Sequence, residues 1–185
     1  SIVCASAFLP FLPVTSVQLL LLNLLYDILC IVLPWDNVDE EETLSPRDWS
    51  GRTLGRFMLS FGPISSLFDI VTFLFLYYFL CPMLCGGATY LNLTSPALRL
   101  QYVSLFQTGW FLESMWTQVL ILHFLRTRRI PFVQSRPSAP VICITLTGIV
   151  AFTAITFTGG ALLFGLTKLP FGYFVFLLTV ALLYM

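Results

Sequence analysis

Three carboxylates of this chain lie inside runs of Leu, Phe and Ile that are long enough to cross a bilayer: Asp27, Asp69 and Glu113. The rest of its nine acidic residues fall in one polar stretch from Asp36 to Asp48. A charged group at the middle of a bilayer costs at least about 2.5 kcal/mol. Carboxylates in such positions therefore either form part of a pathway for ions or pair with groups that neutralise them.

Asn23 and Asp27 are four residues apart in the first of these apolar runs. At about 100° per residue of a helix they share one face, one turn apart. An amide oxygen and a carboxylate on one stripe suit a hard cation, which prefers oxygen ligands. The alternative is an Asn–Asp pair that hydrogen-bonds to neighbouring helices and holds a bundle together. The spacing predicts a metal site and leaves the bundle interpretation open.

Asp69 follows Ser65 and Ser66 and precedes Thr72, which gives its segment a polar stripe. One interpretation is a candidate ion pathway. The other is a carboxylate satisfied by these hydroxyl groups and by a neighbouring helix.

Glu113 shares a predicted helix face with Gly109 and Thr117. Because glycine allows helices to approach closely, we expect Glu113 to face another helix and not lipid. It is a candidate for the ion pathway, as an outer-sphere or proton-exchanging group, and simple structural pairing is the alternative.

The composition belongs to the membrane class, with 58% hydrophobic and 10% charged residues, against roughly 45–50% and 25% in soluble domains. The sequence contains no stripe of basic residues of the kind that binds nucleic acid. The chain also lacks a Walker loop, an Asp-Lys-Thr-Gly phosphorylation motif and any hydrolase triad. ATP hydrolysis, or any other reaction that supplies energy, would have to take place in another part of the protein.

The apolar residues predict an all-α, polytopic transmembrane helical bundle in a lipid bilayer. Continuous apolar runs without period-two alternation exclude a transmembrane barrel. Thr15 and Ser16 supply a helix-start signal, and the short connection before them predicts a tight hairpin. The first and last segments are short for a span of about 20 residues, so we expect a piece of a longer protein. The six predicted segments are 1–10, 17–34, 57–81, 103–125, 141–158 and 171–185.

Basic residues are distributed unevenly between the predicted loops. Of the nine lysines and arginines, only Arg99 and Lys168 lie outside the stretches 34–56 and 126–140. Since cytoplasmic loops carry an excess of Lys and Arg, these two stretches are predicted to face the cytoplasm.

Several strings of the sequence resemble one family of proteins. The segment from Val17 to Asp27 is similar to the sixth transmembrane helix of P-type cation pumps. The strings Leu33–Glu41, Gly55–Phe73, Leu105–Gln118 and Leu125–Val141 look like the magnesium-transporting P-type ATPases.

This resemblance implies that the six segments are the end of the fifth to the start of the tenth helix of such a pump in the cytoplasmic (inner) membrane. It implies that Asn23 and Asp27 are ligands of the transported Mg²⁺, and that Glu113 lies where related pumps carry an eighth-helix carboxylate. ATP would act only through domains of the same polypeptide that this chain lacks. One departure is that Leu22 and residues 28–30 are apolar, where relatives often carry Gln or Ser.

Two other classes of function remain as alternatives. A secondary transporter or channel fragment would use the three carboxylates as a relay, but no convincing internal repeat supports it. A membrane scaffold would use them only for pairing.

Overall fold

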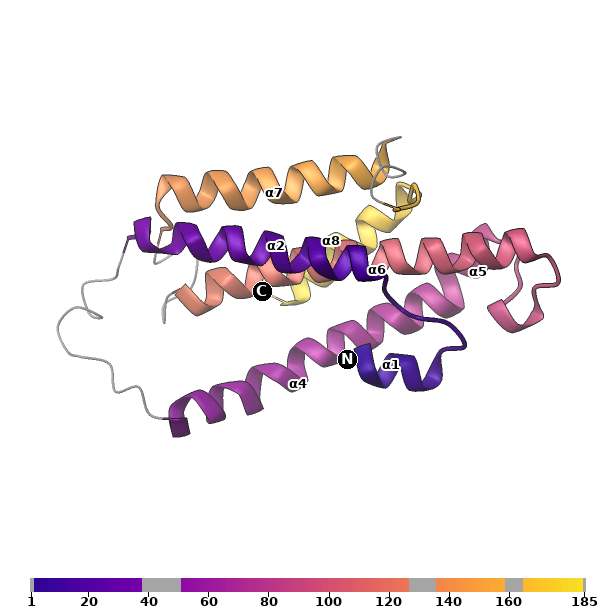
Figure 1. Ribbon diagram of the computed structural model, residues 1–185, viewed down its shortest axis with the longest axis horizontal. Coiled ribbons are helices and arrows are strands. Elements are labelled where there is room, and N and C mark those ends of the chain that lie inside the picture. The colour runs from indigo at the N-terminus through magenta and orange to yellow at the C-terminus, as the bar shows by residue number, and fades with distance from the viewer. Residues whose placement is uncertain (1, 38–50, 127–135, 159–164, 185) are drawn as a thin grey trace.

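The computed structural model describes residues 2–37, 51–126, 136–158 and 165–184, and within these ranges it contains helices and no strand (Figure 1). The predicted all-α bundle is therefore confirmed. The elements are α1 (Ile2–Phe8), α2 (Ser16–Val32), the 3₁₀ turn η1 (Leu33–Trp35), α4 (Gly51–Phe75), the π-helical turn η2 (Leu76–Leu80), α5 (Cys81–Leu84), the 3₁₀ turn η3 (Tyr90–Asn92), α6 (Pro96–Arg126), α7 (Ala139–Phe157) and α8 (Gly172–Tyr184).

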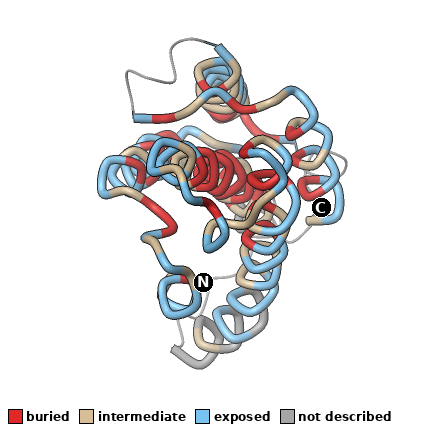
Figure 2. Tube along the Cα trace, turned by 90° about the vertical axis from the view of Figure 1, so that its right-hand side faces the viewer, coloured by how far each residue is buried: buried red, intermediate tan, exposed pale blue. Residues whose placement is uncertain are grey.

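Three stretches of the described helices are long and apolar enough to cross a membrane: Ser16–Trp35, Gly62–Leu84 and Ala139–Phe157. α6 is longer than any of them but more polar, and it packs against α2, α4, α7 and α8. Buried residues concentrate in the middle of the bundle (Figure 2). The polar helix is thus surrounded by the apolar ones, as expected of a multi-pass membrane protein.

Helix α2 begins where the sequence predicts. The Thr15 hydroxyl accepts a hydrogen bond from the Gln18 backbone N–H at 3.3 Å, and the Gln18 side chain accepts from the Thr15 N–H at 3.0 Å. This reciprocal capping box satisfies two backbone donors that lack an intrahelical partner. Pro34 follows the last turn of α2, where the chain tightens into the 3₁₀ turn η1.

Two helices extend beyond the predicted bounds. The segment predicted at 57–81 begins at Gly51, continues through Pro63 without ending, and reaches Leu84 by way of η2 and α5. Pro63 does not end the helix because proline removes only one backbone donor, a loss that membrane helices tolerate. The segment predicted at 103–125 begins at Pro96, since Ser95 followed by proline is a helix-start signal.

The tight hairpin expected between the first two helices does not form, because α1 and α2 are not among the helix pairs that pack together. In Figure 1 α1 lies below α2 and runs in the opposite direction, and Ala5 is its one buried residue. The ring of Phe11, in the connection between them, instead lies 4.9 Å from the ring of Tyr90 and 5.2 Å from that of Phe106. Pro10 and Pro13 favour an extended connection, and the aromatic contacts of Phe11 determine where it leads.

The end of α2 and the beginning of α7 meet at one end of the bundle. An Asp36 carboxylate oxygen accepts a hydrogen bond from the backbone N–H of Ser138, the N-cap residue of α7, at 2.8 Å. The ends of α2 and α6 and the beginnings of α4 and α7 all lie on the left in Figure 1. The acidic run Asp39 to Glu42 lies outside the described residues, and the cytoplasmic assignment of this end stays a prediction.

Candidate functional site

Asn23 and Asp27 lie on the exposed side of α2. The helix packs into the bundle through a stripe at three- and four-residue spacing, with Leu22 3% and Leu29 2% exposed. Asn23 and Asp27 fall on the opposite side and are both exposed. The pair therefore shares one face, but that face does not meet any helix among the residues that the structure describes.

The surroundings of Asn23 and Asp27 are apolar. Leu20, Leu24 and Ile31 are among the exposed large hydrophobic residues of α2. The pair brackets the centre of the apolar stretch Ser16–Trp35, at the depth where an unpartnered carboxylate is most costly. In the part of the chain that the structure describes, no hydrogen bond reaches either side chain, and no three His, Cys, Asp or Glu residues cluster as a metal site would require. Two oxygen ligands are presented here, and the partners must come from elsewhere.

Asp69 and Glu113, which are far apart in sequence, are brought together between α4 and α6. Glu113 is 1% exposed, and its carboxyl group faces that of Asp69. The expectation that Glu113 faces another helix is confirmed. The indole N–H of Trp110 donates a hydrogen bond to an Asp69 carboxylate oxygen at 3.3 Å. The hydrogen-bond donor to Asp69 is thus a tryptophan of the neighbouring helix and not one of the hydroxyl groups considered above.

The close approach of α6 to its neighbours places these carboxyl groups. A Cβ atom added at Gly109 would lie 2.6 Å from a methyl carbon of Leu76, so glycine is needed where α6 passes η2. The Tyr173 hydroxyl of α8 donates to the Gly109 carbonyl oxygen at 2.7 Å. Phe73 of α4 stacks on Trp110 with ring centroids 5.9 Å apart. These contacts hold α4, α6 and α8 together around Glu113.

The sequence did not indicate which helices would face Glu113, so it missed the roles of Trp110 and Tyr173. Trp110 lies one turn before Glu113, but spacing alone does not show that its N–H reaches across to α4. His123, near the end of α6, is 3% exposed and therefore does not reach lipid headgroups.

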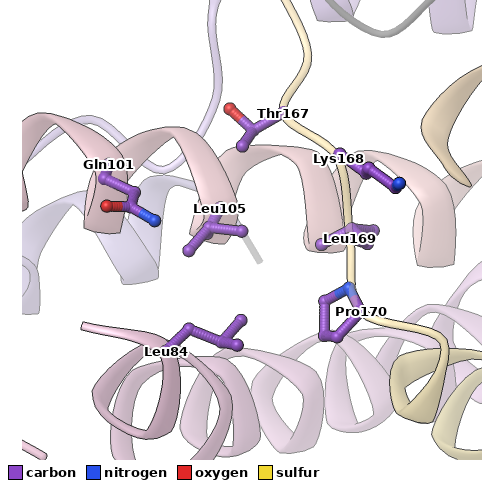
Figure 3. A pocket seen from close by; sticks show the side chains of 7 residues that line it. All are labelled: Leu84, Gln101, Leu105, Thr167, Lys168, Leu169 and Pro170. Carbon is purple, nitrogen blue, oxygen red and sulfur yellow. The ribbon is translucent and has the colours of Figure 1, made fainter. Parts of the chain in front are cut away.

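An open cavity with a volume of about 270 Å³ lies near the start of α6 (Figure 3). It lies at the opposite end of α6 from His123, between α5 and the segment leading to α8. None of the candidate carboxylates borders it. Its lining residues are Leu84, Gln101, Leu105, Thr167, Lys168, Leu169 and Pro170.

Comparisons with known proteins agree with this architecture. Residues 11–185 match the family described as "Cation transporting ATPase, C-terminus". The whole chain is 41% identical over 185 residues to the "Magnesium-transporting ATPase, P-type 1" of Salmonella typhimurium strain 14028s, and 40% identical to the protein of that name from Escherichia coli K12. It spans 19% of the length of each of these relatives. The chain belongs to the C-terminal family of cation-transporting ATPases.

Proposed function

We propose that this chain is the C-terminal transport portion of an ATP-driven P-type pump that moves Mg²⁺ across the cytoplasmic (inner) membrane, and that Asn23 and Asp27 are two ligands of the transported ion. The observation that carries the proposal is the outward placement of both residues at mid-membrane depth on α2. An exposed carboxylate among Leu and Ile side chains would be costly against lipid tails. A cation and further helices of the same polypeptide would remove that cost.

The chemistry of the pair suits magnesium. Mg²⁺ prefers six oxygen ligands in near-octahedral geometry and gives up water reluctantly. One carboxylate and one amide oxygen, spaced one helical turn apart, supply part of such a shell and leave positions for water and for ligands from other helices. The names of the similar pumps from Salmonella and E. coli point to the same ion. These similarities do not favour a secondary transporter or channel.

In this scheme ATP binding and phosphorylation belong to the rest of the polypeptide. This chain contributes charge through Asp27, a neutral oxygen through Asn23, and a rigid helix whose opposite face is packed into the bundle. The Asp69–Glu113 pair lies between other helices and is not assigned as a ligand.

The test is Asp27→Asn in the full-length protein reconstituted in lipid vesicles. Loss of the carboxylate should abolish ATP-dependent Mg²⁺ movement, while the thermal unfolding midpoint without magnesium stays close to that of the wild type. Asp36→Asn is the matched control, because it makes the same chemical change outside the apolar stretch and should retain transport. Magnesium transport at the wild-type rate in Asp27→Asn would refute the assignment.

A further inference from the structure

The contact between Asp69 and Glu113 joins two acidic groups without an evident donor between them. Both carboxylate oxygens of Glu113 are buried, and within the described residues no N–H or O–H group donates to either. Glu113 is 1% exposed, so bulk water does not supply the donor. A buried ion without a partner carries a penalty of several kcal/mol. A further charge, donor or proton must offset this cost.

The groups around the pair do not supply a positive charge. No lysine, arginine or histidine of the described ranges forms an ion pair with Asp69 or Glu113. Helix α8 brings Tyr173 and Tyr184 near enough to interact electrostatically with Glu113. The Tyr173 hydroxyl already donates to a backbone carbonyl, and the Tyr184 hydroxyl lies near Ser65 and donates to neither carboxyl group. The surroundings are therefore polar but not cationic.

Two carboxyl groups in contact, one of them fully buried, cannot both be ionised, because their charges repel and Glu113 is not solvated. We propose that Asp69 and Glu113 bind one proton between them, with the O–H of Glu113 donating to the Asp69 carboxylate. The Trp110 N–H already donates to Asp69, which favours the negative charge on Asp69 and the proton on Glu113. This proton site joins α4 to α6 and is separate from the outward-facing Asn23–Asp27 pair.

A proton fits the site better than a metal ion does. Mg²⁺ or Ca²⁺ would need six or more oxygen ligands. The described surroundings offer two carboxyl groups and neutral hydroxyl groups, and no cluster of three acidic, cysteine or histidine side chains. One proton needs only the two oxygens that face each other.

The proposal is tested by infrared spectroscopy of the full-length protein at neutral pH without magnesium. The wild type should show the deuterium-sensitive carbonyl-stretch band of a protonated carboxylic acid. Glu113→Gln and Asp69→Asn should each lose this band and still unfold close to the wild-type midpoint, because the introduced amide donates to the remaining carboxylate in place of the proton. Asp27→Asn is the control and should keep the band, whatever its effect on transport.

A difference spectrum with no such band lost in Glu113→Gln would overturn the proposal, and so would a band that survives in Asp69→Asn. Glu113→Asp keeps an acid at this position and should retain the band at a shifted frequency, which provides a second variant if an amide is not tolerated. Removal of the band by magnesium in Asp27→Asn would show that the pair binds a metal ion instead of a proton.

Discussion

Helices α2 and α6 each carry an acid near the middle, but they place it on opposite sides. Asp27 of the apolar α2 faces away from the bundle, whereas Glu113 of the more polar α6 is buried within it. In a membrane a polar group must find its partner inside the protein. The direction of a side chain therefore shows whether this chain provides the partner. Glu113 finds neighbours here, and Asp27 must find them in the remainder of the protein.

The two helices also reverse the usual relation between hydrophobicity and burial. α2 is apolar enough to span a membrane and leaves many large side chains exposed, while α6 does not reach that apolarity and is almost entirely covered from Phe106 to Met115. Lipid can solvate the apolar face of α2, but only protein can cover the polar groups of α6. The most polar helix consequently becomes the centre of the bundle.

The largest expected effect is on protein stability, and it distinguishes Glu113 from Asp27. In the full-length protein without magnesium or nucleotide, Glu113→Ala should lower the free energy of unfolding by about 2–5 kcal/mol, because it leaves a cavity and an isolated Asp69 carboxylate. Asp27→Ala removes a charge that has no cation in that state, so it should leave the free energy of unfolding unchanged or raise it. Thermal unfolding in lipid nanodiscs provides the measurement.

Magnesium should narrow the difference in stability between these two variants. An ion at about 100 times its dissociation constant stabilises the folded state by about 2.7 kcal/mol. The wild type and Glu113→Ala should show this stabilisation, and Asp27→Ala should not. Equal magnesium stabilisation in both alanine variants would break the contrast between an outward ion site and an inward structural pair.

The sequence predicts much of this fold but little of the pairing within it. The apolar runs indicate the helices, and Thr15 marks the beginning of α2 because capping is a local interaction. The Asn23–Asp27 stripe is equally local, since residues four apart on a helix always share a face. Which face packs inward is a tertiary property. Spacing therefore does not reveal that Asp69 meets Glu113, or that Trp110 donates to Asp69.

Helix length was harder to predict than helix identity. Pro96 lies outside the segment predicted at 103–125 but begins α6, and Pro63 lies within α4 without ending it. Proline is compatible with the first turn of a helix. Lipid offers no hydrogen-bond partners for backbone groups, so a membrane-spanning helix tends to continue through a proline. Local propensity is thus a weaker guide in this bundle than in water-exposed helices.

Substitution at Gly109 tests whether the packing around α6 is complete within this chain. Gly109→Ala should destabilise the protein by about 1–3 kcal/mol through overpacking, because its Cβ would lie 2.6 Å from a methyl carbon of the buried Leu76. Gly55→Ala in α4 is the matched control, since nothing lies within 4 Å of its Cβ position, and it should be neutral or stabilising. Adding Leu76→Ala should make the pair non-additive by at least about 0.5 kcal/mol. Strict additivity would show that the two residues do not contact each other.

The smallest expected effect concerns the hydrogen bond that joins the end of α2 to the beginning of α7. Asp36→Ala removes the acceptor of the Ser138 N–H and a negative charge at the beginning of α7, and should cost about 0.5–2 kcal/mol. Asp36→Asn keeps an acceptor oxygen and loses only the charge, so it should cost about 0.3–1 kcal/mol. Thermal unfolding at low and high salt separates the two contributions, because salt screens the charge and leaves the hydrogen bond. If both substitutions have equal effects that salt removes, the hydrogen bond contributes nothing, and α2 is held through its buried stripe alone.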